Sequence, residues 1–473
     1  MKKESITKSY IYNLIYQIII TIIPFLVTPY LTRILGANNL GIYSYTFSIV
    51  TIIYLFSALG INTYGQREIA YNQDNKKEYS KIFFELIIIR AFSTFLALIL
   101  SIIITIIEQK YQTYYLIFNI YIIANLFDIT WFYQGLEKFK TITIRSTIIK
   151  IIYLISVFLF IKNTNDLNIY ILLFSLMTLF SNISLWINIR KIINKPDKLE
   201  IKKHIKSVLN FFIPQIAAII YSIVDKIMLG IIGTNIKEVS FYEQASYIVK
   251  TILMIITITN SIMVSKISYE YNKKNLEKIK TYLTNTINFI WIIGIPITFG
   301  ICAVIKNFVP WFYGKEYLSV INLVYIMSPL IIIIGFNNLI GIQFLVSTKN
   351  QNKYILAVSI GAITNFILNL ILIPKLNSIG ATIASVISET IILLIEIYFF
   401  KKIIKDIKIF RKSLKYIIFG IIMFVVAFLS GNMFKSTIYG TFFQIIIGTI
   451  TYIILLLISK DKFILNYLKT IKK

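Results

Sequence analysis

Ten charged side chains lie inside apolar stretches of this sequence, where an isolated charge is costly. Four are basic and six are acidic: Arg90, Lys150, Lys226, Lys250, Glu85, Asp128, Asp225, Glu243, Glu389 and Glu396. A charge at the centre of a bilayer costs about 2.5–3.5 kcal/mol on the lenient insertion scale, so each group needs a partner or a hydrated cavity. The basic groups are suited to bind an anion such as phosphate, and the carboxylates are suited to carry a coupling proton.

The depth of these groups within the apolar stretches separates two roles. Glu85 and Glu396 lie close to the end of a stretch, which favours anchoring at the membrane interface. Lys250 and Glu389 lie near the middle of a stretch, and Arg90 lies deeper than an interfacial anchor would. We therefore expect the deeper groups to find partners on other helices or in a hydrated cavity.

Fourteen apolar stretches carry these groups. Each is near or above the ~20 residues that a helix needs to cross ~30 Å of hydrocarbon. The composition agrees, with 57% hydrophobic residues and a mean hydropathy of +0.76. We therefore predict an all-α integral membrane protein with about 14 transmembrane helices.

The 48 Lys and Arg residues fall mostly in every second connection between the predicted helices. Cytoplasmic loops carry such an excess, so both termini are predicted to lie in the cytoplasm. The formal net charge of +27 is spread over short loops without a folded basic domain. Nucleic acid is therefore not an expected partner, whereas membrane lipids with anionic headgroups are.

The longest basic connection separates six predicted helices from eight, and the sequence after it weakly repeats the start of the chain. Pro24 and Pro214 fall at similar depth in the first helix of each half, which makes them candidate hinges. Repeats of this kind generally enclose a site at their interface and work by alternating access. We predict a six-helix lobe over 1–203, a second six-helix lobe over 204–400 and two additional helices over 401–473.

The residue patterns of common enzymes are missing from the sequence. There is no phosphate-binding glycine-rich loop, no metal-ligand spacing and no nucleophile beside a base, and short outer connections disfavour a membrane-bound polymerase. The single cysteine, Cys302, and the single histidine, His204, rule out a disulfide framework and a His/Cys metal site. His204 is expected to be solvated. We predict a transporter with no catalytic residue, no metal site and no cofactor, driven by a proton or sodium gradient or by equilibration.

Seven segments carry a resemblance to a known family. They are RILGANNLGIYSYTFSI (33–49), ALGINTYGQREIA (58–70), WFYQGLEKFK (131–140), IPQIAAIIYSIVDKIMLG (213–230), FYEQASYIVK (241–250), WFYGKEY (311–317) and GAITNFILNLILIPKLNSIGATIASVISE (361–389). In order and spacing the segments resemble the polysaccharide transporters of the Wzx type, which are bacterial flippases of the multidrug/oligosaccharidyl-lipid/polysaccharide exporter superfamily. The resemblance is weaker over the last two predicted helices.

The resemblance implies a fold, a substrate and partners. The implied fold is two six-helix lobes around a central cavity, with the last two helices packed outside. The implied substrate is a polyprenyl-pyrophosphate-linked oligosaccharide, moved from the inner to the outer leaflet of the bacterial cytoplasmic membrane for capsule, O-antigen or exopolysaccharide assembly. A polysaccharide polymerase and glycosyltransferases are the implied partner proteins, and some relatives couple to protons or sodium.

Together, the charge positions and the resemblance predict a path for the sugar pyrophosphate. The path residues are Arg67, Arg90, Lys150, Lys226 and Lys250, and the candidate carboxylates for ion coupling are Asp128, Asp225, Glu243 and Glu389. Two alternatives stay open. One is a cation-coupled multidrug exporter of the same superfamily, whose substrates favour an acidic, aromatic cavity. The other is a lipid II type flippase, which differs in headgroup and partners.

Overall fold

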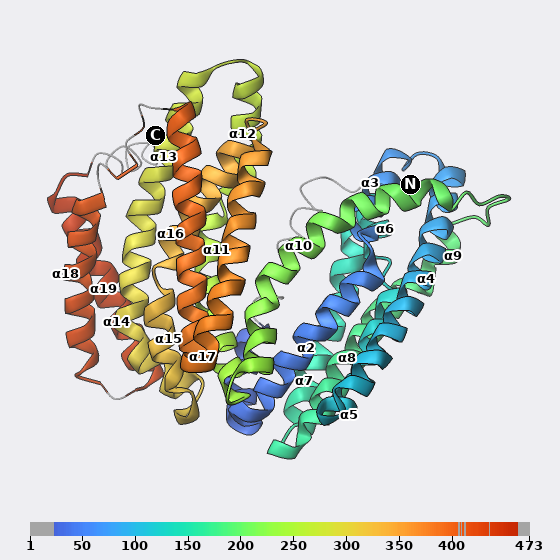
Figure 1. The fold of residues 1–473 in the computed structure, drawn as a ribbon, viewed down its shortest axis with the longest axis horizontal. Helices are drawn as coiled ribbons and strands as arrows, with labels where there is room; N and C mark the ends of the chain where they lie inside the picture. The colour runs from blue at the N-terminus through green and yellow to red at the C-terminus, as the bar shows by residue number, and fades with distance from the viewer. Residues whose placement is uncertain (1–22, 405–406, 408, 411–412, 435, 462–473) are drawn as a thin grey trace. The chain divides into compact units, whose positions relative to one another are not determined.

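The regular structure of this chain is helical. The computed structural model describes residues 23–404, 407, 409–410, 413–434 and 436–461, and it contains no strand within them. Residue contacts divide the chain into two compact units, unit 1 over Met1–Ile227 and unit 2 over Met228–Lys473 (Figure 1). The three-part division with boundaries after residues 203 and 400 stays a prediction.

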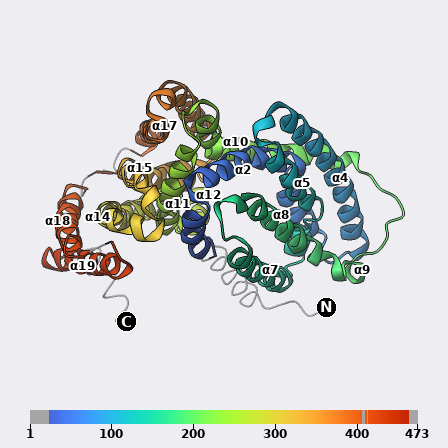
Figure 2. The ribbon, with the colours of Figure 1, turned by 90° about the horizontal axis from the view of Figure 1, so that it is seen from below.

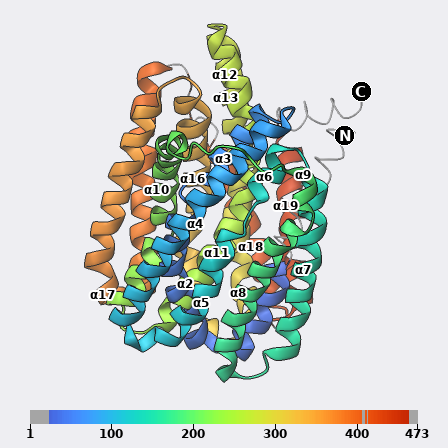
Figure 3. The same cartoon turned by 90° about the vertical axis from the view of Figure 1, so that its right-hand side faces the viewer.

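The described part of unit 1 contains helical residues 23–34, which nine labelled helices follow. They are α2 (Gly36–Ala58), α3 (Ile61–Tyr71), α4 (Lys76–Ile107), α5 (Gln112–Leu126), α6 (Thr130–Gly135), α7 (Phe139–Phe160), α8 (Leu167–Ser184), α9 (Ile189–Ile192) and α10 (Lys202–Ile232), which continues into unit 2. Helix α5 packs against α4 and α8, and α2 packs against α4 and α5 (Figure 3). This arrangement encloses the side chains between α2, α4 and α5.

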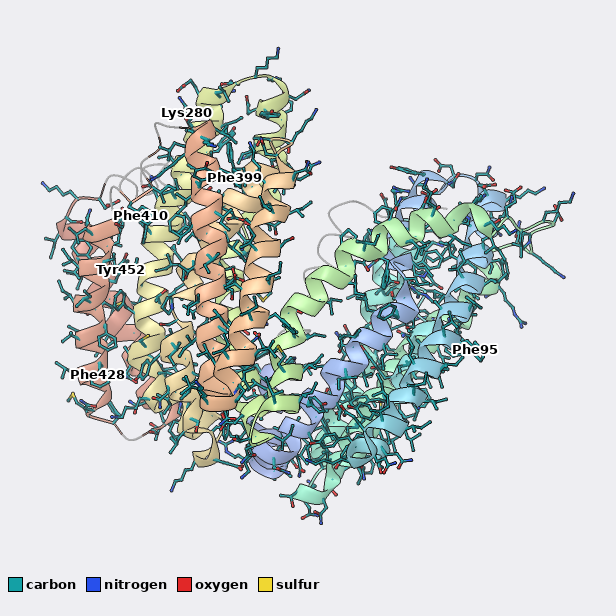
Figure 4. The ribbon with its side chains drawn as sticks, in the orientation of Figure 1. Phe95, Lys280, Phe399, Phe410, Phe428 and Tyr452 are labelled. Atoms are coloured by element: carbon teal, nitrogen blue, oxygen red, sulfur yellow. The ribbon has the colours of Figure 1, made fainter. Side chains whose placement is uncertain are left out.

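The sequence of α4 shows why a helix of this kind forms and how it packs. The Asn75 side chain accepts a hydrogen bond from the backbone N–H of Glu78 at 3.2 Å, which satisfies one of the unpaired donors at the start of the helix. Small residues such as Ser93 and Ala97 face the interior of unit 1 and let neighbouring helices approach closely. Large apolar side chains face outward, among them Phe95, which is labelled in Figure 4 and is 60% exposed.

A close backbone contact holds α10 against the break between α2 and α3. Gly60 lies in this break with φ 75°, and a Cβ atom there would come within 2.8 Å of the Val208 carbonyl oxygen and of the Phe212 backbone nitrogen. Only glycine fits both the left-handed backbone and the short separation. The first part of α10 is therefore seated on unit 1 through backbone atoms.

Unit 2 consists of nine labelled α-helices, two π-helical segments and one 3-10 turn. They are α11 (Lys237–Thr257), α12 (Asn260–Asn272), α13 (Leu276–Phe289), η4 (Ile290–Gly294), α14 (Ile295–Phe312), η5 (Lys315–Tyr317), α15 (Ser319–Met327), α16 (Leu330–Asn337), η6 (Asn338–Val346), α17 (Gln351–Ile403), α18 (Ser413–Gly431) and α19 (Ile438–Ile458). The π-helical segments are η4 and η6, where the backbone turn is wider than in an α-helix. Segment η6 packs against α12 and α17.

Helix α17 contains one backbone break, at Asn377, where φ is 49° and ψ is −128°. The side-chain oxygen of Asn377 accepts hydrogen bonds from the backbone N–H and the hydroxyl of Thr234 at 2.9 and 3.0 Å. The Glu238 carboxylate accepts from the Ser378 N–H at 3.3 Å and also from the Ser378 hydroxyl. Side-chain groups therefore satisfy the backbone at the start of the second half of α17.

The last two helices attach to α14 within unit 2 (Figure 2). The Gln444 side chain on α19 donates to the carbonyl oxygens of Ala303 and Ala427 at 3.1 and 3.0 Å. The same side chain accepts from the amide of Asn307 at 3.0 Å, and the Trp311 indole donates to a hydroxyl of α19 at 2.7 Å. These polar contacts fix α18 and α19 to α14 in an otherwise apolar surrounding.

The prediction of an all-helical membrane protein is confirmed, but the count of 14 transmembrane helices is not. Within the described residues, ten helices are long and apolar enough to cross a membrane, or eleven if the bent pair α11 and α12 forms one span. Most of the first predicted helix lies outside the described residues, and α10 is not among the ten. Two predicted helices are joined into α17, because the chain continues as a helix on both sides of Asn377.

Candidate functional site

The best-defined charged site in unit 1 surrounds Arg90, which is completely buried on α4. Its guanidinium donates to the backbone carbonyl oxygens of Asn125, at 3.4 Å, and of Asp128, and also to the side-chain oxygen of Asn62. The Asp128 carboxylate lies 3.9 Å from the Arg90 Nη1 atom. The structure therefore brings together a predicted path residue, Arg90, and a predicted ion-coupling carboxylate, Asp128.

The break between α5 and α6 explains why Arg90 binds backbone carbonyls. Helix α5 ends at Leu126, and the last carbonyls of a helix have no partner inside the helix. Arg90 supplies donors to two carbonyls at this break, while the Asp128 side chain accepts at 2.9 Å from the backbone N–H of Thr130, the first residue of α6. A phosphate would have to displace these partners to reach Arg90, so the predicted contact between Arg90 and substrate stays a prediction.

Arg67 on α3 is more accessible than Arg90, with 41% of its side chain exposed against 0% for Arg90. Its Nε and Nη2 atoms donate to the Glu68 carboxylate at 3.1 and 2.7 Å. The guanidinium carbon lies 4.9 Å from the ring centre of Phe211, 5.3 Å from that of Tyr64 and 5.8 Å from that of Tyr71. Three aromatic rings and one carboxylate therefore contact the planar group, and its Nη1 makes no hydrogen bond to a described residue.

A second polar cluster, which we call the Tyr64–His204–Glu85 chain, adjoins Arg67 through the ring of Tyr64. The Tyr64 hydroxyl and His204 Nδ1 are 2.7 Å apart, and His204 Nε2 lies 2.7 Å from the Glu85 carboxylate. All three side chains are at least 95% buried. The expectations that His204 is solvated and that Glu85 anchors the chain at the membrane interface are therefore wrong, because these two side chains bond to each other inside the unit.

Charged groups at the edge of this cluster are more exposed. The Lys81 ammonium lies 3.0 Å from the Glu200 carboxylate, and Lys203 lies 3.5 Å from the same carboxylate. The hydrogen bond from Lys81, followed by the charges of both lysines, lowers the pKa of Glu200 below the ordinary glutamate value. The backbone N–H of Glu200 donates to the buried Glu85 carboxylate at 2.6 Å, which joins the exposed groups to the buried ones.

The remaining predicted path residues are spread over both units. In unit 1, Lys150 on α7 and Lys226 on α10 are half-buried. In unit 2, Lys250 is exposed on α11. The structure therefore does not gather the predicted basic path into one cluster within a unit, and the role of each residue in binding substrate stays a prediction.

The predicted ion-coupling carboxylates are equally dispersed. Asp225 is buried on α10, and Glu243 is half-buried on α11. Glu389 on α17 accepts a hydrogen bond at 2.6 Å from the side chain of Asn337, which also donates to the Glu389 carbonyl at 3.2 Å. Asn337 directly precedes the π-helical segment η6, so these hydrogen bonds connect Glu389 to the start of η6.

Glu396 occupies an unusual place near Glu389 on α17. Its side chain is completely buried, and neither carboxylate oxygen has a hydrogen-bond partner among the described residues. A Cβ atom added at Gly341, in η6, would lie 2.4 Å from one of these oxygens. Interfacial anchoring does not describe this side chain, because an anchoring carboxylate reaches water.

The candidate hinges lie in helices, and a small cavity lies beside the break in α17. Pro214 lies inside α10, and Pro24 lies in the helical residues 23–34, so both proline positions are helical. The break in α17 borders a cavity of about 220 Å³ that is lined partly by Glu238 and Asn322. Typical ligand sites measure about 300–1,000 Å³, so this cavity is too small for an oligosaccharide.

Sequence reasoning missed several residues that organise these clusters. Asn62 and Asn125 lie inside apolar stretches, so a polar amide in a predicted span was an available signal for the Arg90 site. The pairing of His204 with Glu85 had no local signal, since 119 residues separate them. Long-range contacts of this kind leave no periodic pattern in a single sequence.

Comparisons with known proteins agree with the resemblance seen in the sequence. The sequence profile of a family described as "Polysaccharide biosynthesis protein" matches residues 6–265. A protein of Escherichia coli (strain K12) named "Putative O-antigen transporter" is 22% identical over 402 residues, which cover 82% of this chain and 95% of that protein. A protein of Shigella dysenteriae with the same name is 31% identical over 146 residues, or 30% of this chain and 37% of that protein.

Two solved structures have a similar fold. The inward closed conformation of the lipid II flippase MurJ matches with a TM-score of 0.72 and 19% identity, covering 96% of this chain and 99% of that one. An inward-facing multidrug resistance transporter of the MATE family matches with a TM-score of 0.59 and 15% identity, covering 83% and 94%. At these identities the likeness concerns the fold alone.

Proposed function

Because this chain belongs to the polysaccharide biosynthesis protein family, we propose that it is a flippase for lipid-linked oligosaccharides. The observation that carries the proposal is the similarity to an O-antigen transporter along 95% of that protein's length. The family and the relatives favour a transporter over an enzyme. The many membrane-crossing helices of the described residues agree with a multi-pass membrane protein.

The finer proposal concerns the substrate and its route. The substrate is an oligosaccharide repeat unit on polyprenyl pyrophosphate, which moves from the inner to the outer leaflet of the bacterial cytoplasmic membrane by alternating access. It serves capsule, O-antigen or exopolysaccharide assembly, with glycosyltransferases supplying the repeat unit and a polymerase consuming it. Both termini lie in the cytoplasm, as the distribution of Lys and Arg predicts.

Arg67 is the residue that we assign to the first contact with the pyrophosphate. The Glu68 carboxylate pairs with Nε and Nη2 of this partly exposed guanidinium, and Nη1 is the N–H group that is left to meet a phosphate oxygen. Lys150, Lys226 and Lys250 continue the cationic path. Arg90 contributes by holding the α5–α6 break in shape, since its Nη1 atom donates to two backbone carbonyls there.

A proton or sodium gradient supplies the driving force in this proposal. Glu389 is the best-supported coupling carboxylate, because Asn337 fixes its orientation beside the π-helical segment η6. Asp128, Asp225 and Glu243 are the other candidates. Pro24 and Pro214 permit the helix bending that alternating access requires.

Reconstitution in liposomes tests the proposed activity. Purified protein is mixed with fluorescent lipid-linked oligosaccharide, and an impermeant reagent measures how much of the sugar becomes accessible on the other leaflet. Arg67→Gln is expected to slow transfer by about tenfold or more, because a charge-assisted hydrogen bond contributes about 1.5–3 kcal/mol. Arg190→Gln, which removes an exposed arginine of α9, serves as the matched control and is expected to leave transfer unchanged.

The same assay separates the proposed function from its two rivals. Liposomes that contain lipid II test the peptidoglycan precursor, and liposomes loaded with a cationic dye test multidrug export. Transfer of the lipid-linked oligosaccharide in preference to both supports the proposal. Transfer of lipid II or export of the dye at a rate equal to or above that of the lipid-linked oligosaccharide would refute it.

A further inference from the structure

The only histidine of the chain is buried between two other titratable side chains of unit 1. His204 lies in the first turn of α10, Tyr64 belongs to α3 and Glu85 belongs to α4. His204 is 2% exposed, Glu85 is 0% exposed and Tyr64 is 5% exposed. Both ring nitrogens of the histidine lie 2.7 Å from their partners, so the imidazole closes a continuous hydrogen-bonded line from Tyr64 to Glu85.

Hydrogen-bond chemistry defines the proton positions along this line. The Glu85 carboxylate accepts the backbone N–H of Glu200 at 2.6 Å, which marks it as an acceptor group. His204 Nε2 therefore carries a hydrogen and donates to Glu85. In the neutral imidazole the other nitrogen, Nδ1, has a free lone pair and accepts from the Tyr64 hydroxyl. A second proton has one place to bind, which is Nδ1.

Charged side chains from α4 and α10 surround this position. Two lysines approach three carboxylates in this region. Lys81 lies 4.0 Å from Glu85 and 3.0 Å from Glu200. Lys203 lies 3.7 Å from Glu85, 3.5 Å from Glu200 and 3.8 Å from Glu78. The carboxylates outnumber the lysines by one. A protonated imidazole at this position would lie directly against Glu85, the most buried of the three carboxylates.

From this arrangement we propose that the Tyr64–His204–Glu85 chain is a proton-binding site that clamps the first turn of α10 onto unit 1. When Nδ1 takes up a proton from water, it becomes a donor to the Tyr64 oxygen, and the Tyr64 hydroxyl hydrogen turns away. The hydrogen bond to Glu85 becomes charge-assisted on both sides and stronger. Loss of the proton returns the neutral pattern and weakens the clamp.

This proton site deepens the proposed function and rests on it for its relevance to transport. The ring of Tyr64 faces the guanidinium of Arg67 at 5.3 Å, so the proton site lies directly behind the proposed pyrophosphate contact. Helix α10 is also held by the backbone approach to Gly60 in the same region. A proton on His204 therefore acts on both the position of α10 and the ring that supports Arg67.

The single histidine permits a direct test on the intact protein. Isotope-labelled histidine, in protein purified without a polyhistidine tag, reports on His204 alone in nuclear magnetic resonance. We expect its ring nitrogen signals to change reversibly on acidification from about pH 8 to pH 5, with Nε2 protonated throughout. In Glu85→Gln the pH range of the change should move, because the charge that faces Nε2 is gone. Signals that stay constant over this range, or that are unaffected by E85Q, would overturn the proposal.

Hydrogen exchange tests the clamp itself. We expect backbone amides of residues 202–208, corrected for intrinsic exchange, to be about fivefold better protected at the acidic end of this range than at the basic end. In His204→Gln the side-chain amide still donates to Glu85 but takes up no proton, so this ratio should fall to about one. Equal pH dependence in wild type and H204Q would contradict the clamp.

The outcomes separate this inference from the proposed function. Neither measurement uses a substrate, so the proton site stands or falls without reference to lipid transfer. A protein that transfers lipid-linked oligosaccharide but shows an inert His204 would retain the flippase function and lose the proton site.

Discussion

Replacing Arg90 by methionine tests whether this residue stabilises unit 1 or binds substrate. The substitution keeps an unbranched apolar side chain on α4 but removes every donor of the guanidinium. Three acceptors then lose their buried partner: the carbonyl oxygens of Asn125 and Asp128 and the side-chain oxygen of Asn62. We expect Arg90→Met to destabilise unit 1 because of this loss.

The size of the effect follows from the number of lost contacts. Hydrogen bonds between helices of membrane proteins contribute about 0.6 kcal/mol on average and at most about 1.7 kcal/mol, so three of them amount to about 2–5 kcal/mol. Removing a buried charge recovers part of its desolvation cost. The expected loss is therefore about 2–3 kcal/mol, which corresponds to a melting temperature lower by about 4–12 °C.

The assay is thermal unfolding in lipid nanodiscs, and Arg90→Lys is the informative companion. Lysine keeps the charge but carries its three donors on one nitrogen, so it does not span the carbonyls on one side and Asn62 on the other. We expect R90K to recover little of the stability lost in R90M. A wild-type melting temperature for R90M together with a strong loss of lipid transfer would refute this reasoning and make Arg90 a substrate ligand.

Three further predictions concern other contacts. Gly60→Ala should destabilise unit 1 by about 2 kcal/mol or more in thermal unfolding, whereas Gly300→Ala, whose added Cβ would meet its nearest neighbour at 3.7 Å, should not. Gln444→Leu should loosen α18 and α19 from α14, which limited proteolysis of the 432–437 connection detects as faster cleavage; unchanged cleavage would contradict it. Because the pKa of Glu200 is lowered, its pairing with Lys81 stabilises the folded protein at pH values above the ordinary glutamate pKa, and this stabilisation is lost as the pH falls through the lowered pKa. The melting temperature of E200Q should therefore depend less on pH in the acid range than that of the wild type.

Sequence and structure agree where a local pattern determines the outcome. The apolar runs of α4 and α19 are long enough to be read as membrane helices without any further information. The π-helical segment η6 has no such signal, because its residues are as apolar as those of an α-helix. Pro374 lies three residues before the break at Asn377 and favours the end of a helix there. The chain nevertheless continues as a helix on both sides of Asn377, which the proline did not predict.

In the candidate site, too, the residues with a local sequence signal were predicted and their long-range partners were not. Arg90 and Asp128 were identifiable because a charge inside an apolar stretch is costly wherever it lies. Their actual partners were not, since backbone carbonyls at the end of α5 become available only when that helix ends. The role of Arg67 likewise depends on Phe211, which approaches it from α10.

The attachment of α18 and α19 to α14 has a mechanical consequence for unit 2. Helices of 19 and 21 residues are about 29 and 32 Å long, close to the ~30 Å thickness of hydrocarbon, whereas the 32 residues of α4 extend about 48 Å. A rigid pair of matched length resists displacement along the membrane normal, because any rise or fall moves apolar ends into water. The matched length of this pair therefore favours a constant depth of unit 2 in the bilayer.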